Sequence, residues 1–298
     1  MADLTPPRRF LQVDIEEVAA IVHDVAREEI LPRWRGLAEH EIIQKSGPRD
    51  LVTVADQAAE AALARRLTSE YPGTYVVGEE TVARSPDRLS LLRSAAPVWV
   101  IDPIDGTYAF AHGEPEFGVM LALVQAGELL AAWIHEPVDG GMTLGERGAS
   151  VQHVATDGSR TTSLRANDRP VPEMTGIVSG GIVLEPGGSV IRAEKARHFR
   201  DLRHHACPAR DYPRVLRGEA DFAAYSKCLP WDHLAGAMLL SEAGYVVAKF
   251  DGSPYAVGDM TGGVLCAQSR RAWEEIRERL SRSEGRSPAR VTERQQPE

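Results

Sequence analysis

The segment from Trp99 to Thr107, which reads WVIDPIDGT, constrains the fold of this 298-residue chain more than any other. It begins as an apolar strand and ends with two carboxylates, Asp102 and Asp105, on either side of a Pro-Ile pair. A proline at that place predicts a tight turn that lets both carboxylates face one point. Gly106 and Thr107 then predict the first turn of a helix, where unpaired backbone N–H groups favour a phosphate. Because ligands of α/β sheets gather at strand ends, the segment indicates a magnesium-dependent phosphate site.

The composition is that of an ordinary globular protein. Hydrophobic residues make up 43% of the chain and charged residues 26%, as is typical of such proteins, and the length of 298 residues is enough for one large α/β domain or two compact halves. The net charge of −9 disfavours a nucleic-acid partner. No apolar run reaches membrane-spanning length, and the polar segment Met1–Arg9 has the pattern of neither a signal peptide nor an anchor. We therefore expect a cytoplasmic protein without a membrane partner, in which Cys207, Cys228 and Cys266 are reduced thiols rather than zinc ligands or disulfides.

Hydrophobic periodicity predicts helices and strands throughout the first half. The segment Val13–Leu37 predicts one long N-terminal helix, kinked or interrupted at Pro32. Thr53 and Asp56 have the spacing of a capping box and predict a helix that ends near Tyr71. Strands are predicted at 75–77, 98–101, 117–125, 129–135 and 142–144, with a hairpin between the third and the fourth.

The second half is predicted to begin after a turn-rich junction at 157–172. We therefore divide the chain into an N-terminal α+β half (1–157), which carries most candidate metal ligands, a C-terminal α/β half (158–282) and a disordered tail (283–298). Strands are predicted at 175–179 with Val183, 222–225, 245–250 and 263–267, and helices at 212–217, 234–242 and 270–282.

Four acidic residues lie at the predicted ends of elements rather than on solvent faces: Glu79, Asp102, Asp105 and Asp232. If they converge, each pair of charges about 4 Å apart repels by roughly 4 kcal/mol at an effective dielectric near 20. Two Mg²⁺ ions would neutralise the four charges. All the donors are oxygens, with no histidine or cysteine nearby to favour zinc, so the pattern predicts a two-metal magnesium site.

Each residue taken alone has a simpler interpretation. Asp232 has the position of a helix cap, and Asp56 is as well explained by the capping box as by a catalytic role. Glu79 and Glu80 resemble a solvated loop pair. The pair Asp102 and Asp105 has no comparable structural explanation.

The Asp-x-x-Asp-Gly-Thr pattern invites comparison with the Asp-x-Asp-Gly-Thr nucleophile motif of haloacid dehalogenase phosphatases. The spacing here is one residue longer, which changes where the second side chain points. We reject that interpretation.

Four motifs together resemble the inositol monophosphatase family in order and spacing, and the short segment Glu146–Ala149 adds to them. The motifs are DLVTVAD at 50–56, VGEE at 77–80, WVIDPIDGT at 99–107 and WDHLAGAMLLSEAG at 231–244. The resemblance implies the layered αβαβα sandwich that this family shares with fructose-1,6-bisphosphatase. It also implies a lithium-sensitive, Mg²⁺-dependent phosphatase that acts on a small phosphorylated metabolite and forms a homodimer. Two or three Mg²⁺ ions are expected, with Mn²⁺ able to substitute and Li⁺ an expected inhibitor.

The resemblance also assigns roles to residues of this chain. It implies metal binding by the side chains of Glu79, Asp102, Asp105 and Asp232 and by the Ile104 carbonyl. It implies that Thr107 and Asp56 orient the attacking water and that Lys45 and Glu80 lie near the metals. It implies substrate or phosphate binding by Asp105, Gly106, Thr107, Tyr225 and Asp232.

The chain departs from the family pattern where the leaving group would bind. Tyr108-Ala-Phe110 replaces the common Thr-Asn-Phe, Tyr225 occupies the position of a glutamate in inositol-specific members, and Ala206–Ala209 replaces a Gly-Ser/Thr-Ala-Ala stretch. We expect an inositol-1-phosphate-like sugar or polyol phosphate as substrate. The alternatives are histidinol phosphate, fructose 1,6-bisphosphate and 3′-phosphoadenosine 5′-phosphate, or a non-catalytic regulator that binds metal or phosphate.

Overall fold

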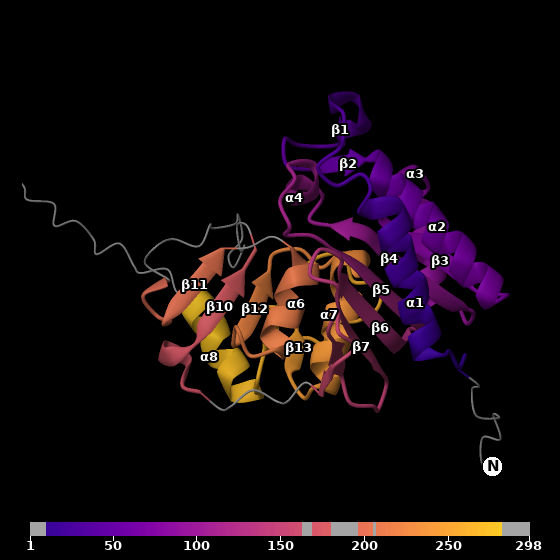
Figure 1. Ribbon diagram of the computed structural model, residues 1–298. Coiled ribbons are helices and arrows are strands. Elements are labelled where there is room, and N and C mark those ends of the chain that lie inside the picture. The colour runs from indigo at the N-terminus through magenta and orange to yellow at the C-terminus, as the bar shows by residue number, and fades with distance from the viewer. Residues whose placement is uncertain (1–9, 163–168, 180–195, 205–206, 282–298) are drawn as a thin grey trace, which may run out of the picture.

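The computed structural model of the chain describes residues 10–162, 169–179, 196–204 and 207–281 (Figure 1). The predictions for Met1–Arg9, for Val183 and for the tail 283–298 lie outside these ranges.

Five layers of helices and sheets stack in the order predicted from the resemblance. Helices α1 (Ile15–Val25) and α2 (Val54–Glu70) cover one face of a seven-stranded sheet. Helices α6 (Pro208–Leu216) and α7 (Pro230–Glu242) separate it from a five-stranded sheet, whose other face is covered by α8 (Arg270–Ser281). Figure 1 shows these layers side by side, with α1 and α2 at one end and α8 at the other. The αβαβα sandwich is therefore confirmed.

The seven-stranded sheet has the order β3-β4-β5-β6-β7-β8-β9, in which only the β3–β4 pair is parallel. The predicted hairpin joins β5 and β6 through Ala126 and Gly127, both with positive φ, as such tight turns require. The strands are β3 (Tyr75–Gly78), β4 (Pro97–Asp105), β5 (Gly118–Gln125), β6 (Glu128–Glu136), β7 (Gly141–Glu146), β8 (Gln152–Val154) and β9 (Arg160–Thr162). Strand β9 lies beyond residue 157 and still pairs within this sheet. The division of the chain at residue 157 stays a prediction.

The five-stranded sheet has the order β11-β10-β12-β14-β13 and mixes parallel with antiparallel pairs. Its strands are β10 (Thr175–Val178), β11 (Asp201–His204), β12 (Phe222–Tyr225), β13 (Val246–Ala248) and β14 (Val264–Ala267). The sequence did not predict β11, because this edge strand is short and mostly exposed and so lacks a hydrophobic pattern.

Smaller elements connect these layers. They are the π-helix η1 (Ala26–Ile30), the 3₁₀ helices η2 (Glu39–Glu41), η3 (Pro86–Arg93) and η4 (Val171–Glu173), the hairpin strands β1 (Ile42–Gln44) and β2 (Leu51–Thr53), and the short helices α3 (Glu79–Arg84) and α4 (Thr107–Ala111).

The prediction of one helix from Val13 to Leu37 is wrong at its C-terminal end. Asp14 caps α1 by accepting two backbone N–H groups, and regular α-helix ends at Val25, where the π-helix η1 follows. Pro32 cannot donate a backbone hydrogen bond, and Arg35 has a φ of 65°, which turns the chain away from the helix axis.

Candidate active site

The central strand β4 delivers both carboxylates of the DPID motif. It continues through Asp105, with a shift of register against β5 between Asp102 and Asp105, so the predicted tight turn is instead a bulge within the strand. One oxygen of Asp102 accepts the backbone N–H of Ile104 at 3.1 Å. Asp105 accepts the backbone N–H of Ala209 at 2.5 Å, which ties the strand to the start of α6. The bulge thus brings two buried carboxylates to one corner of the fold.

A second pair of acids lies at the start of α3, directly after β3. The ammonium group of Lys45 donates to Glu79 at 2.9 Å and to Glu80 at 2.7 Å. Glu80 is 4% exposed, so this pair is not the solvated loop pair that its local sequence resembles. Although burial acts to lower it, the two carboxylates raise the pKa of Lys45 above its ordinary range.

Asp232 approaches the same corner from the first turn of α7. The cap position of that helix is Leu229 and no side chain caps it, so the helix-cap interpretation of Asp232 is wrong. Withdrawal from water raises the pKa of Asp232 well above its ordinary value, and the charges of Asp105 and Glu79 raise it further. A hydrogen bond shared with Asp102 acts in the opposite direction. The structure therefore brings together all four acids that the sequence singled out.

Asp56 serves as a capping residue and as a member of the site at once. Its Oδ2 accepts the backbone N–H of Thr53 at 2.8 Å and the Thr53 hydroxyl at 2.6 Å, which completes the capping box of α2. Its Oδ1 lies 3.2 Å from the hydroxyl of Thr107. That hydroxyl also lies 2.9 Å from the carbonyl oxygen of Ile104. The capping box thus fixes the carboxylate that faces Thr107.

Gly106 gives the chain its turn from β4 into α4. It has a φ of +88°, and a Cβ at this position would lie 2.6 Å from the carbonyl oxygen of Glu116. Both facts require glycine. The backbone N–H groups of Gly106 and Thr107, which the resemblance assigns to phosphate binding, lie at this turn beside Asp105.

The electrostatics of the corner fit a divalent cation. Burial raises the pKa of Asp102 well above its ordinary value, and the neighbouring charges of Glu79 and Asp105 add to the shift. Burial also raises the pKa of Asp105 to about 7 and that of Asp56 to about 7. Such shifts mean that ionised carboxylates lack sufficient positive charge around them, and an all-oxygen donor set is the one that Mg²⁺ prefers.

The acids are not already arranged as a metal cage. Within the part of the chain that the structure describes, no group of three or more His, Cys, Asp or Glu side chains is positioned to hold a metal ion. Lys45 instead binds Glu79, and one backbone N–H group binds one oxygen each of Asp102 and Asp105. Metal binding would therefore require these side chains to rearrange.

Tyr108, one of the departures from the family pattern, joins two segments beside the site. Its ring stacks on the imidazole of His112 with centroids 4.1 Å apart. The guanidinium carbon of Arg49 lies 4.8 Å from the centre of the same ring. Arg49 belongs to the loop between β1 and β2 that carries Lys45, so the stack connects that loop to α4.

Tyr225, a second of the three departures, lies in a buried network. It is 1% exposed and its hydroxyl is 3.4 Å from a carboxylate oxygen of Asp211, while its ring contacts those of Tyr212 and His233. Its assignment to the substrate pocket stays a prediction, and its burial gives that assignment no support.

Two residues that the sequence did not single out contact the site. Cys207 lies 3.5 Å from the backbone oxygen of Asp105, and its place in the segment Ala206–Ala209, which departs from the family pattern on the leaving-group side, could have indicated this. Glu60 binds the start of α3 and lies four residues after Asp56 on α2. That spacing places both acids on one helix face and could have identified Glu60.

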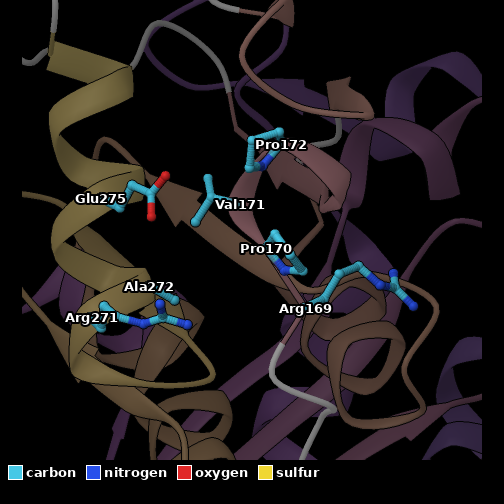
Figure 2. Close-up of a pocket in the computed structure, with 7 residues that line it drawn as sticks. All are labelled: Arg169, Pro170, Val171, Pro172, Arg271, Ala272 and Glu275. Atoms are coloured by element: carbon cyan, nitrogen blue, oxygen red, sulfur yellow. The ribbon is translucent and has the colours of Figure 1, made fainter.

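A cavity of about 120 Å³ lies elsewhere, between α8 and η4 on the outer side of the five-stranded sheet. Figure 2 shows Arg169 and Pro170 to Pro172 on one side of it and Arg271, Ala272 and Glu275 on the helix opposite. None of the candidate site residues lines it. Among the described helices, none is long and apolar enough to cross a membrane.

Comparisons with known proteins agree with this fold. The sequence model of the Inositol monophosphatase family matches residues 10–284. Fructose-1,6-bisphosphatase/inositol-1-monophosphatase of Thermotoga maritima is 30% identical over 209 residues, which cover 70% of this chain and 75% of that protein. Inositol-1-monophosphatase of Mycobacterium leprae is 31% identical over 235 residues, which cover 78% of this chain and 79% of that protein. The solved structure of a Thermotoga maritima IMPase has a TM-score of 0.70 at 22% identity, covers 89% of this chain and 95% of its own, and shows the same fold.

Proposed function

The chain belongs to the inositol monophosphatase family, and we propose that it hydrolyses a small phosphomonoester by direct attack of water with Mg²⁺ as its cofactor. Family membership makes it a phosphoric monoester hydrolase. The observation that carries the proposal is the meeting of Glu79 from α3, Asp102 and Asp105 from β4 and Asp232 from α7 at one corner, beside the pair Asp56 and Thr107.

The side chains of Glu79, Asp102, Asp105 and Asp232 and the carbonyl oxygen of Ile104 would hold the metal ions. When bound, Mg²⁺ supplies the positive charge that lowers the pKa of a water and stabilises phosphate oxygens. The oxygen of Thr107 can accept a hydrogen bond from the attacking water while its own proton is donated to Asp56. The N–H groups of Gly106 and Thr107 would donate to the phosphate, where charge is greatest during phosphoryl transfer.

We propose a sugar or polyol phosphate similar to inositol 1-phosphate as the substrate. The name inositol-1-monophosphatase, which the Thermotoga and Mycobacterium relatives share, supports this class, while the Thermotoga name also includes fructose-1,6-bisphosphatase. Histidinol phosphate, fructose 1,6-bisphosphate and 3′-phosphoadenosine 5′-phosphate are the alternatives, because Tyr108 and Tyr225 change the leaving-group side of the family pattern. A non-catalytic regulator ranks below these, since every residue assigned to metal or water is present. We further propose that the enzyme is a cytoplasmic homodimer.

The proposal is tested by release of inorganic phosphate from a panel of these phosphomonoesters. We expect turnover with Mg²⁺, partial turnover with Mn²⁺, inhibition by Li⁺ and none in EDTA. The substrate with the highest kcat/KM identifies the alcohol. Tight Mg²⁺ binding with no turnover of any substrate would instead favour the regulator.

A further inference from the structure

Glu60 is a buried acid to which no role in metal, water or phosphate binding has been assigned so far. It lies on α2 one helical turn after Asp56 and is 2% exposed. One carboxylate oxygen accepts the backbone N–H of Glu80 at 2.8 Å, and the other accepts the hydroxyl of Thr81. Arg84 is the nearby cation, 3.8 Å away and largely exposed. The carboxylate therefore faces the first turn of α3 and not solvent.

The first turn of α3 needs a partner from outside its own sequence. Its cap residue is Gly78, which has no side chain to accept the unpaired N–H groups of the turn. Glu60 supplies the missing acceptor from α2, and its negative charge also suits a helix N-terminus. The fit is close, because a Cβ on Gly78 would lie 2.3 Å from the Glu60 carboxylate.

Glu79 lies between Gly78 and Glu80, the two residues that the Glu60 carboxylate contacts. It is the first residue of α3, preceded by Gly78 and followed by Glu80, whose N–H binds Glu60. The backbone on both sides of Glu79 therefore rests against one carboxylate. From the other direction, Lys45 holds the Glu79 side chain at 2.9 Å.

We propose that Glu60 is a positioning residue, which caps α3 from α2 and thereby sets the orientation of Glu79 for metal binding. The helix α2 then presents two acids to the site, Asp56 toward Thr107 and Glu60 toward the start of α3. The inference rests on the proposed function, because it takes Glu79 to be a metal ligand.

The test compares Mg²⁺ affinity, measured by isothermal titration calorimetry, with thermal stability in EDTA. Loss of groups that orient metal ligands typically weakens metal binding ~10–100-fold. Glu60→Gln keeps one acceptor oxygen but loses the second acceptor and the negative charge at the start of α3, and we expect it to raise the Kd for Mg²⁺ by that factor. Thr81→Val removes one of the two contacts and should give a smaller increase. Thr81→Ser keeps the hydroxyl and should restore wild-type affinity.

Asp221→Asn is the matched control. Asp221 is also a buried acid that accepts a backbone N–H, from Thr175 at 2.7 Å, and pairs with an arginine, Arg169, but it lies in the five-stranded sheet region. This variant should lose thermal stability and keep the Mg²⁺ affinity of the wild type.

The outcomes separate the two proposals. If Glu60→Gln loses stability as Asp221→Asn does while its Kd for Mg²⁺ is unchanged, the role is structural only and this inference is wrong. If Glu60→Gln does not fold, the comparison of Thr81→Val with Thr81→Ser tests the inference. Equal affinities of these two variants for Mg²⁺ would overturn it. If the wild type itself binds no Mg²⁺, the proposed function fails and the inference fails with it.

Discussion

The hydroxyl of Thr107 lies 3.2 Å from a carboxylate oxygen of Asp56, although the two residues are 51 positions apart in the chain. Asp56 is held by the capping box of α2, and Thr107 by the bulged end of β4 and the turn at Gly106. Two separate elements thus position the two partners of this hydrogen bond. This geometry suits a pair that accepts and orients a water molecule.

Asp56→Asn should lower kcat by ~10²–10⁴-fold, because an amide cannot accept the proton that the carboxylate accepts. Thr107→Val should have a similar effect, and the double variant should be little worse than either, since residues that act as a unit are not additive. Thr107→Ser keeps the hydroxyl and serves as the control. Steady-state kinetics at saturating Mg²⁺ measure all four variants. Fully additive losses in the double variant would contradict a shared role.

Asp102→Asn should abolish turnover, with a loss on the order of 10³-fold or more, because it removes charge at the centre of the acidic corner. The same change should raise the thermal stability of the protein in EDTA, since burial and neighbouring acids raise the pKa of Asp102 and make its charge unfavourable. Differential scanning fluorimetry with EDTA and with Mg²⁺ tests both statements. Mg²⁺ should stabilise the wild type and leave the variant unchanged.

Turnover by Asp102→Asn that still depends on Mg²⁺ would refute the assignment of Asp102 as a ligand. Asp24→Asn, a substitution of a partly exposed acid on α1 that pairs with the exposed Arg27, is the control for the change of charge alone.

Local patterns in the sequence predict many of the strands and helices and the four acids at their ends, whereas the order of the layers was expected from the family resemblance. Apolar runs that end at carboxylates mark the strands, and the spacing of Thr53 and Asp56 marks a helix start that the structure reproduces. What it misses depends on contacts between distant residues. The bulge between Asp102 and Asp105 is set by pairing with β5, which no local pattern encodes. The edge strand β11 exists because β10 is its neighbour.

The role of Glu60 illustrates the same limit. Its sequence context is an ordinary helix, and the need for it arises at Gly78, which follows 18 residues later and lacks a side chain to cap α3. Pro32 illustrates the opposite case, because its effect on the first helix is local and was anticipated, although the helix ends earlier than predicted. Contacts across elements therefore account for most of what sequence patterns leave out.

Gly106→Ala should destabilise the protein and impair catalysis together. A φ of +88° costs a non-glycine residue roughly 1–3 kcal/mol. The added Cβ would also lie 2.6 Å from the carbonyl oxygen of Glu116 and displace the turn that carries the Thr107 N–H. Gly73→Ala is a matched control, because Gly73 has a φ of +86° and open space around its Cβ position. Urea unfolding and kcat measure the two effects. If Gly106→Ala and Gly73→Ala lose the same unfolding free energy and both keep the kcat of the wild type, the close contact at Gly106 does not matter.

His135 should make the protein less stable as the pH falls below neutrality. Burial lowers its pKa to about 4, with a small further effect of the neighbouring His23 ring, while its Nδ1 donates to the carbonyl of Gly141 at 2.9 Å. The unfolded chain has an ordinary histidine pKa near 6.5, so between pH 6.5 and 4 the unfolded state binds more protons and stability is lost. Between pH 7.5 and 5 this one group should account for about 2 kcal/mol.

His135→Gln should therefore show a shallower loss of unfolding free energy over that range than the wild type, when both are measured by urea unfolding in EDTA. The difference between the two proteins isolates His135 from the acidic corner, which titrates in both. His40→Gln, at an exposed position, is the control, because it removes an imidazole without removing a buried one. Parallel losses in the wild type and in His135→Gln would mean that this imidazole is protonated at the same pH in the folded and the unfolded chain.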